Sequence, residues 1–336
     1  ETLEERPRQS IAVDDDALIV RDLHVAFPGG QGAMINVVSG VNFTLRRGET
    51  LGLVGESGSG KSMTALAVLG LVPPSGEVST GEAWFAGRDL IALPDADRNA
   101  IRGPEIATIF QDPIAGFSPV HTIRQQLIEP LQIHRGLNKA EATRRAIELL
   151  DLVGVPNAAQ RINDYPHQFS DGMAQRAMIA LALSCNPKLL IADEPTTALD
   201  VTVQAQVLDL LRDLAARFDM SMLLITHDLG VVAETCDRVL VMYAGEIVEE
   251  GVAAEILERP RHPYTHALLK AMPRNDRRMA RMPTIPGVVP APDDWPSGCR
   301  FSPRCVHASE RCAAAPVALE NGVRCVRVGE LAFEAT

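Results

Sequence analysis

Residues 55–62 read Gly55-Glu56-Ser57-Gly58-Ser59-Gly60-Lys61-Ser62, which matches the pattern G-x-x-x-x-G-K-[ST]. The loop follows the apolar run 50–54, which is typical of a strand buried on both faces, and a helix is expected after it to about residue 70. Glycines let backbone N–H groups curl around a phosphate, and the helix N-terminus adds partial positive charge. Lys61 can reach the β- and γ-phosphates, and the Ser62 hydroxyl suits Mg²⁺. The stretch therefore predicts nucleotide binding.

A second apolar strand, 188–192, is followed directly by Asp193 and Glu194. In a parallel sheet, the carboxyl ends of the strands meet at one edge, so both acids are expected beside the phosphate loop. Asp193 suits the Mg²⁺ shell, and Glu194 would polarise the attacking water. Acids after a strand also cap helices, but the accompanying phosphate loop favours the catalytic interpretation.

The surrounding pattern predicts an α/β protein. Alternating apolar positions in 18–27 and 41–45 indicate antiparallel strands joined by the Gly-rich turn 28–32. Further strands are expected at 81–85, 106–110, 221–226 and 238–242, with helices in the middle section 123–187 and at 203–218. Strands alternating with helices imply a parallel sheet with right-handed crossovers.

Length and composition exclude several classes of protein. A chain of 336 residues predicts two compact units, or one large unit with an extension. With 46% hydrophobic and 22% charged residues, it is not a disordered chain, and its net charge of −11 disfavours nucleic-acid binding. No apolar run is long enough to cross a membrane, and the start lacks a secretory signal pattern. Residues 1–16 are polar and acidic, which predicts a flexible arm.

The order of motifs along the chain carries a family resemblance. After the phosphate loop come Gln111, the segment Ser170-Asp171-Gly172-Met173-Ala174-Gln175-Arg176, the acids Asp193-Glu194, Ala198-Leu199-Asp200 and His227. In this order the sequence resembles the ATP-binding cassette (ABC) family. The resemblance implies a P-loop ABC ATPase fold over 17–258, with a mostly parallel core sheet, an antiparallel β subdomain and a helical subdomain at about 117–187.

The resemblance also implies a composite ATP site between two cassettes that face each other head to tail. Glu194, His227 and Gln111 would have catalytic roles, with His227 contacting the γ-phosphate and Phe27 stacking on adenine. Mg²⁺ would be held by Ser62, Gln111 and Asp193. The residues implied to bind ATP in this chain are Phe27, Gly55, Ser57, Gly58, Ser59, Gly60, Lys61, Ser62, Met63, Gln111 and Asp193, while Ser170, Gly172 and Gln175 would complete the partner's site.

One position departs from the family pattern. The family has two glycines after the serine of this segment, because backbone N–H groups must approach the partner's γ-phosphate closely. Here the first of the two is Asp171. Its bulk and charge would weaken hydrolysis at the site that this chain completes. Alternatively, Asp171 points away and caps the helix that is expected to begin near Gly172.

The remainder of the chain, 259–336, is Pro-rich and is expected to form a separate, irregular extension. Residues 262–269, His-Pro-Tyr-Thr-His-Ala-Leu-Leu, followed by Pro273, resemble the C-terminal motif of ATPase subunits from dipeptide and oligopeptide importers, including nickel-uptake relatives. We interpret His262 and His266 as parts of a packed turn rather than metal ligands. The basic run Arg274, Arg277, Arg278 and Arg281 indicates a solvated face, with contact to anionic lipid as the alternative.

Four cysteines crowd into the extension, in the pattern Cys299-x5-Cys305-x6-Cys312-x12-Cys325. They could supply four thiolates to one metal centre, although zinc-ribbon spacing is a poor fit. The resemblance to peptide-importer ATPases implies a 4Fe-4S cluster with a structural role; redox sensing and disulfides are the alternatives. Cys185 and Cys236 lie in apolar surroundings and are expected to be inert core residues.

The implied function is an ATP-hydrolysing subunit that powers peptide import at the cytoplasmic face of the cell membrane. Its implied partners are a second ABC ATPase subunit (identical or distinct), two transmembrane permease subunits and an extracytoplasmic solute-binding protein, without nucleic acid. Two alternatives are a regulatory ATP-binding subunit with a degenerate composite site, and nickel import. A soluble ABC protein of DNA repair or translation fits less well, because the chain has neither tandem cassettes nor a basic charge.

Overall fold

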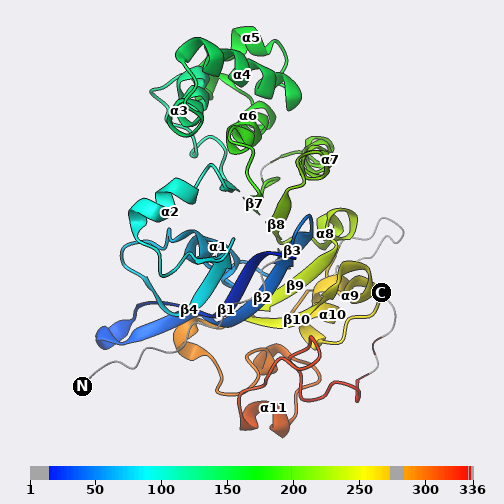
Figure 1. Cartoon of the computed structure of the whole chain (residues 1–336). Helices are drawn as coiled ribbons and strands as arrows, with labels where there is room; N and C mark the ends of the chain where they lie inside the picture. Colours follow the sequence, from blue (N-terminus) through cyan, green and yellow to red (C-terminus); the bar gives the residue numbers. More distant parts are fainter. Residues whose placement is uncertain (1–14, 198, 273–283, 332, 334–336) are drawn as a thin grey trace, which may run out of the picture.

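The computed structural model describes residues 15–197, 199–272, 284–331 and 333, and its core is a six-stranded sheet in the order β10-β9-β3-β8-β7-β6 (Figure 1). Five of these strands run parallel, and β10 pairs antiparallel with β9 at the edge. The predicted parallel sheet is confirmed, whereas the edge strand β10 was not expected. The strands are β3 (Thr50–Val54), β6 (Ile106–Ile109), β7 (Leu189–Asp193), β8 (Ser221–Thr226), β9 (Arg238–Tyr243) and β10 (Glu246–Val252).

A second, antiparallel sheet has the order β2-β1-β4-β5. Its first pair is the expected hairpin, with the short 3-10 turn η1 (Gly30–Gly32) between the two strands, and β1 starts at residue 16, slightly earlier than the apolar pattern suggested. The strands are β1 (Asp16–Pro28), β2 (Met34–Arg46), β4 (Glu77–Phe85) and β5 (Arg88–Asp89).

Helix α1 (Lys61–Leu69) lies between the two sheets, as its buried contacts show. Ala67 and Val68 of α1 belong to the same hydrophobic cluster as Leu45 of β2 and Leu53 of β3. Gly70 ends the helix in a left-handed conformation, with its N–H bonded back to Leu66 and Ala67. Helix α1 is therefore packed against both sheets, and the phosphate loop precedes it directly.

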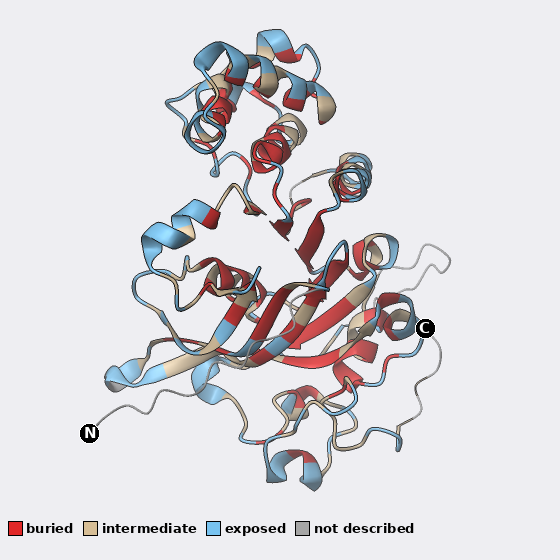
Figure 2. Ribbon diagram, in the orientation of Figure 1, coloured by how far each residue is buried: buried red, intermediate tan, exposed pale blue. Residues whose placement is uncertain are grey.

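The predicted helical section forms a distinct lobe at the top of Figure 1. Asn138 starts α4 with a complete capping box, and Thr122 does the same for α3. Figure 2 shows that the outer faces of these helices are exposed and that buried residues face inward. The lobe consists of α3 (Ile123–Arg135), α4 (Lys139–Leu152), α5 (Ala158–Arg161), η2 (Pro166–Gln168) and α6 (Asp171–Leu183); α2 (Asp95–Ile101), α7 (Val201–Phe218) and α8 (Leu229–Thr235) lie nearer the sheets.

The extension is less separate than its composition predicts, because it packs against the core sheet. Tyr264, Leu269 and Phe301 lie in one buried cluster with Val54 of β3 and Tyr243 of β9. Aromatic rings make this contact: the centroids of Tyr243 and Tyr264 are 4.6 Å apart. The described elements of the extension are α10 (Pro263–Lys270), η3 (Pro292–Asp294), η4 (Ser302–Arg304) and α11 (Glu310–Ala314), and α9 (Ala253–Glu258) directly precedes it.

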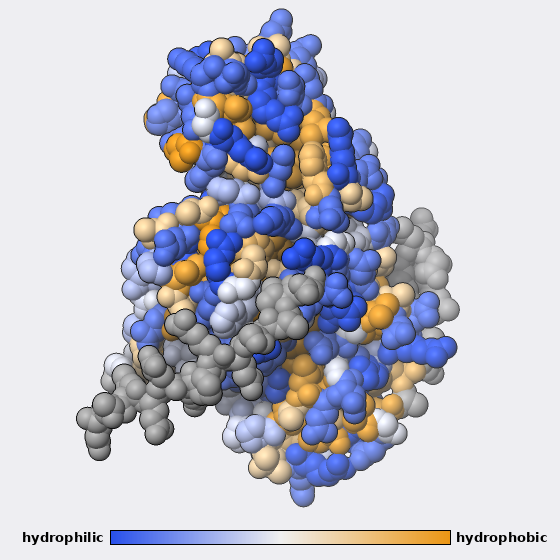
Figure 3. All heavy atoms as spheres, in the orientation of Figure 1, coloured by the Kyte–Doolittle hydropathy of each residue, from blue (hydrophilic) through white to orange (hydrophobic). Residues whose placement is uncertain are grey.

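Some sequence predictions fall outside the described residues. These are most of the arm 1–16, Ala198, and the basic run Arg274, Arg277, Arg278 and Arg281. Within the described residues, no helix combines the length and apolar character needed to cross a membrane. Figure 3 shows mostly hydrophilic side chains on the face in view, interrupted by apolar patches.

Candidate nucleotide site

Three glycines give the phosphate loop backbone conformations that residues with a side chain rarely adopt. Gly55, Gly58 and Gly60 have φ values of 158°, 79° and 105°. A Cβ on Gly55 would lie 2.2 Å from the carbonyl oxygen of Met242, so β9 closes directly onto the loop. Ser57 and Gly58 form the exposed tip, whereas Ser59 is buried and its carbonyl accepts the N–H of Gly245.

Lys61 lies under this loop. Its Nζ donates hydrogen bonds to the carbonyl oxygens of Gly55 (2.8 Å) and Glu56 (3.0 Å). Burial lowers the pKa of Lys61, and the nearby carboxylates of Glu194, Asp193 and Glu56 partly oppose that effect. The ammonium is thus held within the loop, where a phosphate could replace the two carbonyls as its partner.

Two acids meet the loop at the carboxyl end of β7, as the sequence predicted. Oδ1 of Asp193 accepts a hydrogen bond of 3.0 Å from Ser62 Oγ. Burial raises the pKa of Asp193, and the bond from Ser62 and the charge of Lys61 oppose this shift. A hydroxyl and a carboxylate at this separation are oxygen ligands of the kind that Mg²⁺ prefers, so the residues present fit the ion.

Glu194 gathers three side chains from different parts of the chain. Gln111 Nε2 and Thr197 Oγ1 donate to its Oε2 at 3.1 and 2.9 Å, and His227 Nδ1 lies 3.3 Å from its Oε1. Glu194 has a φ of 47°, a left-handed conformation that costs a non-glycine residue about 1–2 kcal/mol. Its N–H bonds to the carbonyl of Ile225 on β8 and helps to hold this strained geometry.

The structure therefore brings Gln111, Glu194 and His227 together, as the family resemblance implied. Sequence reasoning missed Thr197, although its place three residues after Glu194 was a usable signal: a hydroxyl at that spacing in a turn can bond back to the acid. Met63, the third residue of α1, packs against the core cluster with part of its side chain exposed.

Phe27 lies at the end of β1, where it is partly buried. Its ring rests against Gly76; a Cβ on that glycine would come within 2.5 Å of the ring. The ring thus lies at the end of β1, which is an inner strand of the antiparallel sheet.

The segment that begins at Ser170 lies in the helical lobe, away from α1 in Figure 1. Ser170, not Asp171, is the N-cap of α6: its Oγ accepts the N–H of Met173 at 3.3 Å. The helix begins at Asp171, so the capping role considered for this residue is wrong, and its exposed carboxylate stands in the first turn. Gly172 is half-buried, and Gln175 is 1% exposed, with no hydrogen-bond partner for Nε2 among the described residues.

The four cysteines of the extension line one small pocket together with His262, Phe301 and His307. All four are free thiols. Burial raises the pKa of Cys299 to about 12, and burial also raises the pKa values of Cys305 and Cys325. Within the described part of the chain, no three Cys, His, Asp or Glu side chains stand in an arrangement that could hold a metal ion. The thiols share a pocket, but they are not arranged as ligands.

Two family models and a solved structure match parts of this chain. The ABC transporter family model matches residues 38–197, and the model for the oligopeptide/dipeptide transporter C-terminal region matches residues 248–312. The structure of a dimeric ABC transporter cassette in a post-hydrolysis state with ADP and Pi is similar at a TM-score of 0.64 and 28% identity, covering 70% of this chain and 98% of that one.

Sequence relatives define the family of this chain more narrowly. It is 52% identical over 299 residues to the oligopeptide transport ATP-binding protein OppD of Salmonella typhimurium, covering 89% of each chain. It is 47% identical over 302 residues to the dipeptide transport ATP-binding protein DppD of Escherichia coli, covering 90% of this chain and 92% of the relative. Because the match extends through the cassette and the C-terminal region alike, this chain belongs to the family of ATP-binding proteins of oligopeptide and dipeptide ABC transporters.

Proposed function

We propose that this chain hydrolyses ATP to power the import of peptides through a membrane ABC transporter. The observation that carries the proposal is the gathering of Gln111, Thr197 and His227 around Glu194, next to a complete phosphate loop. The peptide class rests on the C-terminal family match and on relatives that are named for oligopeptides and dipeptides. Those names favour peptide over nickel as the cargo.

Each side chain has a role that its position supports. Lys61 would exchange its bonds to loop carbonyls for the β- and γ-phosphates of ATP. Mg²⁺, when bound, neutralises phosphate charge, and Ser62, Asp193 and Gln111 would hold it. Thr197 would orient the carboxylate of Glu194, which would take the proton of the attacking water. His227 would donate a hydrogen bond to the γ-phosphate.

The ATP site is composite in this proposal. The similar solved cassette is dimeric, and the exposed N-terminus of α6, around Ser170 and Gly172, would face the nucleotide of a second ATPase subunit. Gln175 would have to leave its buried position to take part. Two transmembrane permeases and an extracytoplasmic solute-binding protein would complete the importer, with this chain bound peripherally at the cytoplasmic face.

A 4Fe-4S cluster is part of the proposal, supported by the shared pocket of Cys299, Cys305, Cys312 and Cys325. Binding iron would require the buried thiols to lose their protons and turn toward a common centre. We expect about four iron and four sulfide per anaerobically purified chain, and a loss of both in Cys305→Ser. One equivalent of zinc without iron would contradict the assignment.

A regulatory role is the second candidate, because the exposed Asp171 stands where the family has glycine. The two candidates predict different effects of replacing the catalytic glutamate. Turnover depends on Glu194 of this chain if the chain is an ATPase, and on the corresponding glutamate of the partner if the chain is regulatory. In the assembled transporter, Glu194→Gln in this chain alone is compared with the same change in the partner. If this chain works as an ATPase, its variant binds ATP but loses turnover by about 10²–10⁴-fold. Turnover that survives here and fails with the partner's variant would make this chain a regulatory ATP clamp.

A further inference from the structure

The C-terminal extension contacts the phosphate loop directly, at Glu56. The guanidinium of Arg304 donates two parallel hydrogen bonds to the Glu56 carboxylate, from Nη1 at 2.8 Å and from Nη2 at 3.0 Å. The backbone N–H of Glu56 donates to the hydroxyl oxygen of Tyr264, also in the extension, at 2.9 Å. Lys61 bonds to the carbonyl of the same residue, so the side chain, N–H and C=O of Glu56 are all engaged.

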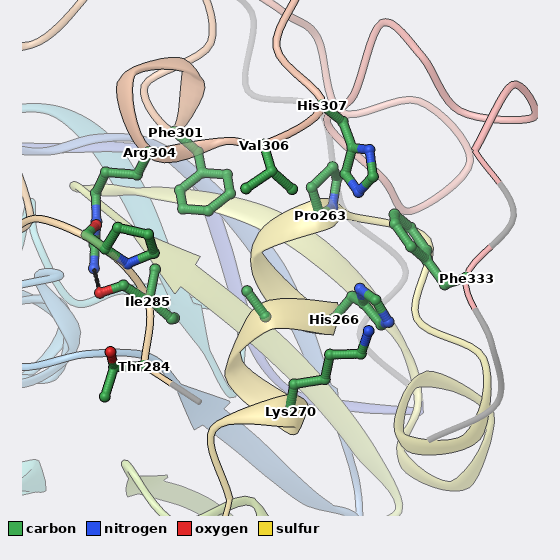
Figure 4. A pocket seen from close by; sticks show the side chains of 12 residues that line it. Pro263, His266, Lys270, Thr284, Ile285, Phe301, Arg304, Val306, His307 and Phe333 are labelled. Carbon is green, nitrogen blue, oxygen red and sulfur yellow. Dashed lines mark hydrogen bonds between the residues drawn. The ribbon is translucent and has the colours of Figure 1, made fainter. Parts of the chain in front are cut away.

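Contacts with other residues also hold the Arg304 side chain in place. Its Nε donates to the carbonyl of Pro286 at 2.7 Å, and Nη1 lies 3.3 Å from the hydroxyl of Tyr243. Its side chain is only 5% exposed. Figure 4 shows Arg304 and Ile285 on one side of a pocket of about 590 Å³, with His266 and Lys270 on the other. The guanidinium is therefore a fixed support and not a mobile surface charge.

The charges of Glu56 and Arg304 lie beside the loop that would bind the phosphates of ATP. Glu56 is the second residue of the phosphate loop, so an unpaired carboxylate there would repel the phosphates of ATP. Burial alone would lower the pKa of Arg304, but its hydrogen bonds to Glu56 and Tyr243 outweigh burial and raise it. Burial also raises the pKa of Tyr264, so its hydroxyl stays neutral beside the loop. Arg304 thus supplies the charge that balances Glu56.

We propose that Arg304 is a positioning residue for ATP: from the C-terminal extension, it neutralises Glu56 and holds the phosphate loop in its binding conformation. A loop that is ordered before the ligand arrives loses less conformational entropy on binding, so ATP affinity rises. Arg304 also directly precedes Cys305 at the end of η4, so the cysteine-bearing segment sets the position of the guanidinium. The extension is in this way part of the nucleotide site.

The competing explanation is that the pair only attaches the extension to the cassette. The two explanations differ in what a second substitution at Glu56 does. If Arg304 acts through the charge and position of Glu56, removing the Glu56 carboxylate restores part of the affinity lost with Arg304. If Arg304 only attaches the extension, changing Glu56 as well restores nothing.

The experiment measures Mg-ATP binding to the full-length chain by calorimetry and kcat and KM in the assembled transporter. This inference rests on the proposed nucleotide site, and wild-type protein that fails to bind ATP would contradict that site instead. For Arg304→Gln we expect the Kd and KM to rise about tenfold, with kcat within about twofold of wild type. Arg304→Lys keeps the positive charge but loses the planar group that donates two parallel hydrogen bonds, and it is expected to raise Kd about threefold.

In the double variant Glu56→Gln/Arg304→Gln, Kd should return to within about threefold of wild type, because the unpaired carboxylate is gone. Arg311→Gln is the matched control: Arg311 is also in the extension and pairs with a glutamate, Glu330, at 2.6 Å, but it is 64% exposed and has no bond to the loop. Its Kd should be unchanged.

Two results would overturn the proposal. The first is an unchanged Kd in folded Arg304→Gln protein, even if its melting temperature falls. The second is a raised Kd that the Glu56 substitution does not reduce at all. If Arg304→Gln does not fold, Arg304→Lys takes its place, and an unchanged Kd in that variant has the same consequence.

Discussion

Ser62 Oγ donates a hydrogen bond of 3.0 Å to Asp193 Oδ1, although 131 residues separate them along the chain. Ser62 is the second residue of α1 and Asp193 is the last residue of β7, so the bond joins the phosphate loop to the carboxyl edge of the core sheet. Both atoms are hard oxygen ligands. We expect this pair to separate slightly around Mg²⁺ and to hold it against the phosphates.

Replacing Ser62 by Ala should therefore raise the Mg²⁺ concentration that gives half-maximal ATPase activity by about tenfold or more, since one ligand of the ion is lost. The measurement is a Mg²⁺ titration of turnover at fixed ATP. Ser62→Thr is the control, because it keeps the hydroxyl and still matches the loop pattern. A Mg²⁺ requirement that stays the same in Ser62→Ala would remove this residue from the metal site.

Thr197 should matter for the chemical step rather than for binding. Its hydroxyl donates to Glu194 Oε2 at 2.9 Å and orients the proposed base. We expect Thr197→Ala to lower kcat about tenfold with little change in KM, because a misdirected carboxylate is a poorer base while ATP contacts remain. Thr197→Ser should recover most of the rate. Equal rates for the Ala and Ser variants would show that Thr197 does not position Glu194.

The core of the fold and of the site was predictable because it depends on local patterns. Continuous apolar runs such as 50–54 and 221–226 are typical of strands in a parallel sheet that is covered on both faces. Strand ends in such a sheet converge on one edge, so Asp193 and the phosphate loop could be placed together from their positions in the sequence alone.

Contacts between distant segments were not predictable in the same way. The Pro-rich composition after residue 259 is typical of irregular structure, but nothing in it indicates that Tyr264 and Phe301 pack on Tyr243. Likewise, Arg304 and Glu56 lie 248 residues apart, and neither belongs to a pattern that names the other. Salt bridges of this kind depend on where whole elements pack, which local propensity does not record.

His262 should make the extension sensitive to acid. The side chain is 1% exposed and caps α10 by accepting the N–H of Tyr264 at Nδ1, and burial lowers its pKa to about 3. In an unfolded chain, the pKa of a histidine is about 6.5. Between these values the unfolded state binds more protons, so the free energy of unfolding falls as pH drops, by at most about 1.4 kcal/mol per pH unit.

The substitution His262→Asn tests this, because Asn also caps helices but does not titrate. The melting temperature of the variant should decline less than that of wild type between pH 7 and 5. The charged groups nearby are Glu249, whose carboxylate accepts the N–H of His262, and Arg261 and Arg324. Burial raises the pKa of Glu249, so this group increases the free energy of unfolding as pH falls. This effect is present in both the wild type and the variant, so it does not change the comparison. Parallel curves would rule out His262 as the acid-sensitive group.

Phe27 should contribute to ATP affinity if adenine stacks on its ring. Stacking of a base on an aromatic side chain is worth about 1–3 kcal/mol, so Phe27→Ala should raise the KM for ATP about tenfold, and Phe27→Tyr should leave it nearly unchanged. Steady-state ATPase kinetics with all three proteins measure this. A lower melting temperature with an unaltered KM would mean that the ring serves only to pack against Gly76.

Asp171 should weaken the ATP site that this chain completes for its partner. Its carboxylate is exposed in the first turn of α6, next to the N–H groups that would meet the partner's γ-phosphate. An acid there stabilises the helix by about 0.3–1 kcal/mol but repels a phosphate. Asp171→Gly should therefore raise turnover at that site while lowering the melting temperature slightly.

Asp171→Asn separates the two reasons for this effect, because it removes the charge and keeps most of the volume. ATP turnover is measured in the assembled transporter, with each Asp171 variant in place of the wild-type chain and Glu194 left intact. If charge repulsion dominates, Asn and Gly raise turnover alike; if bulk dominates, only Gly does. Equal turnover in all three proteins would mean that the carboxylate points away from the nucleotide and that its place in the first turn only supports the helix.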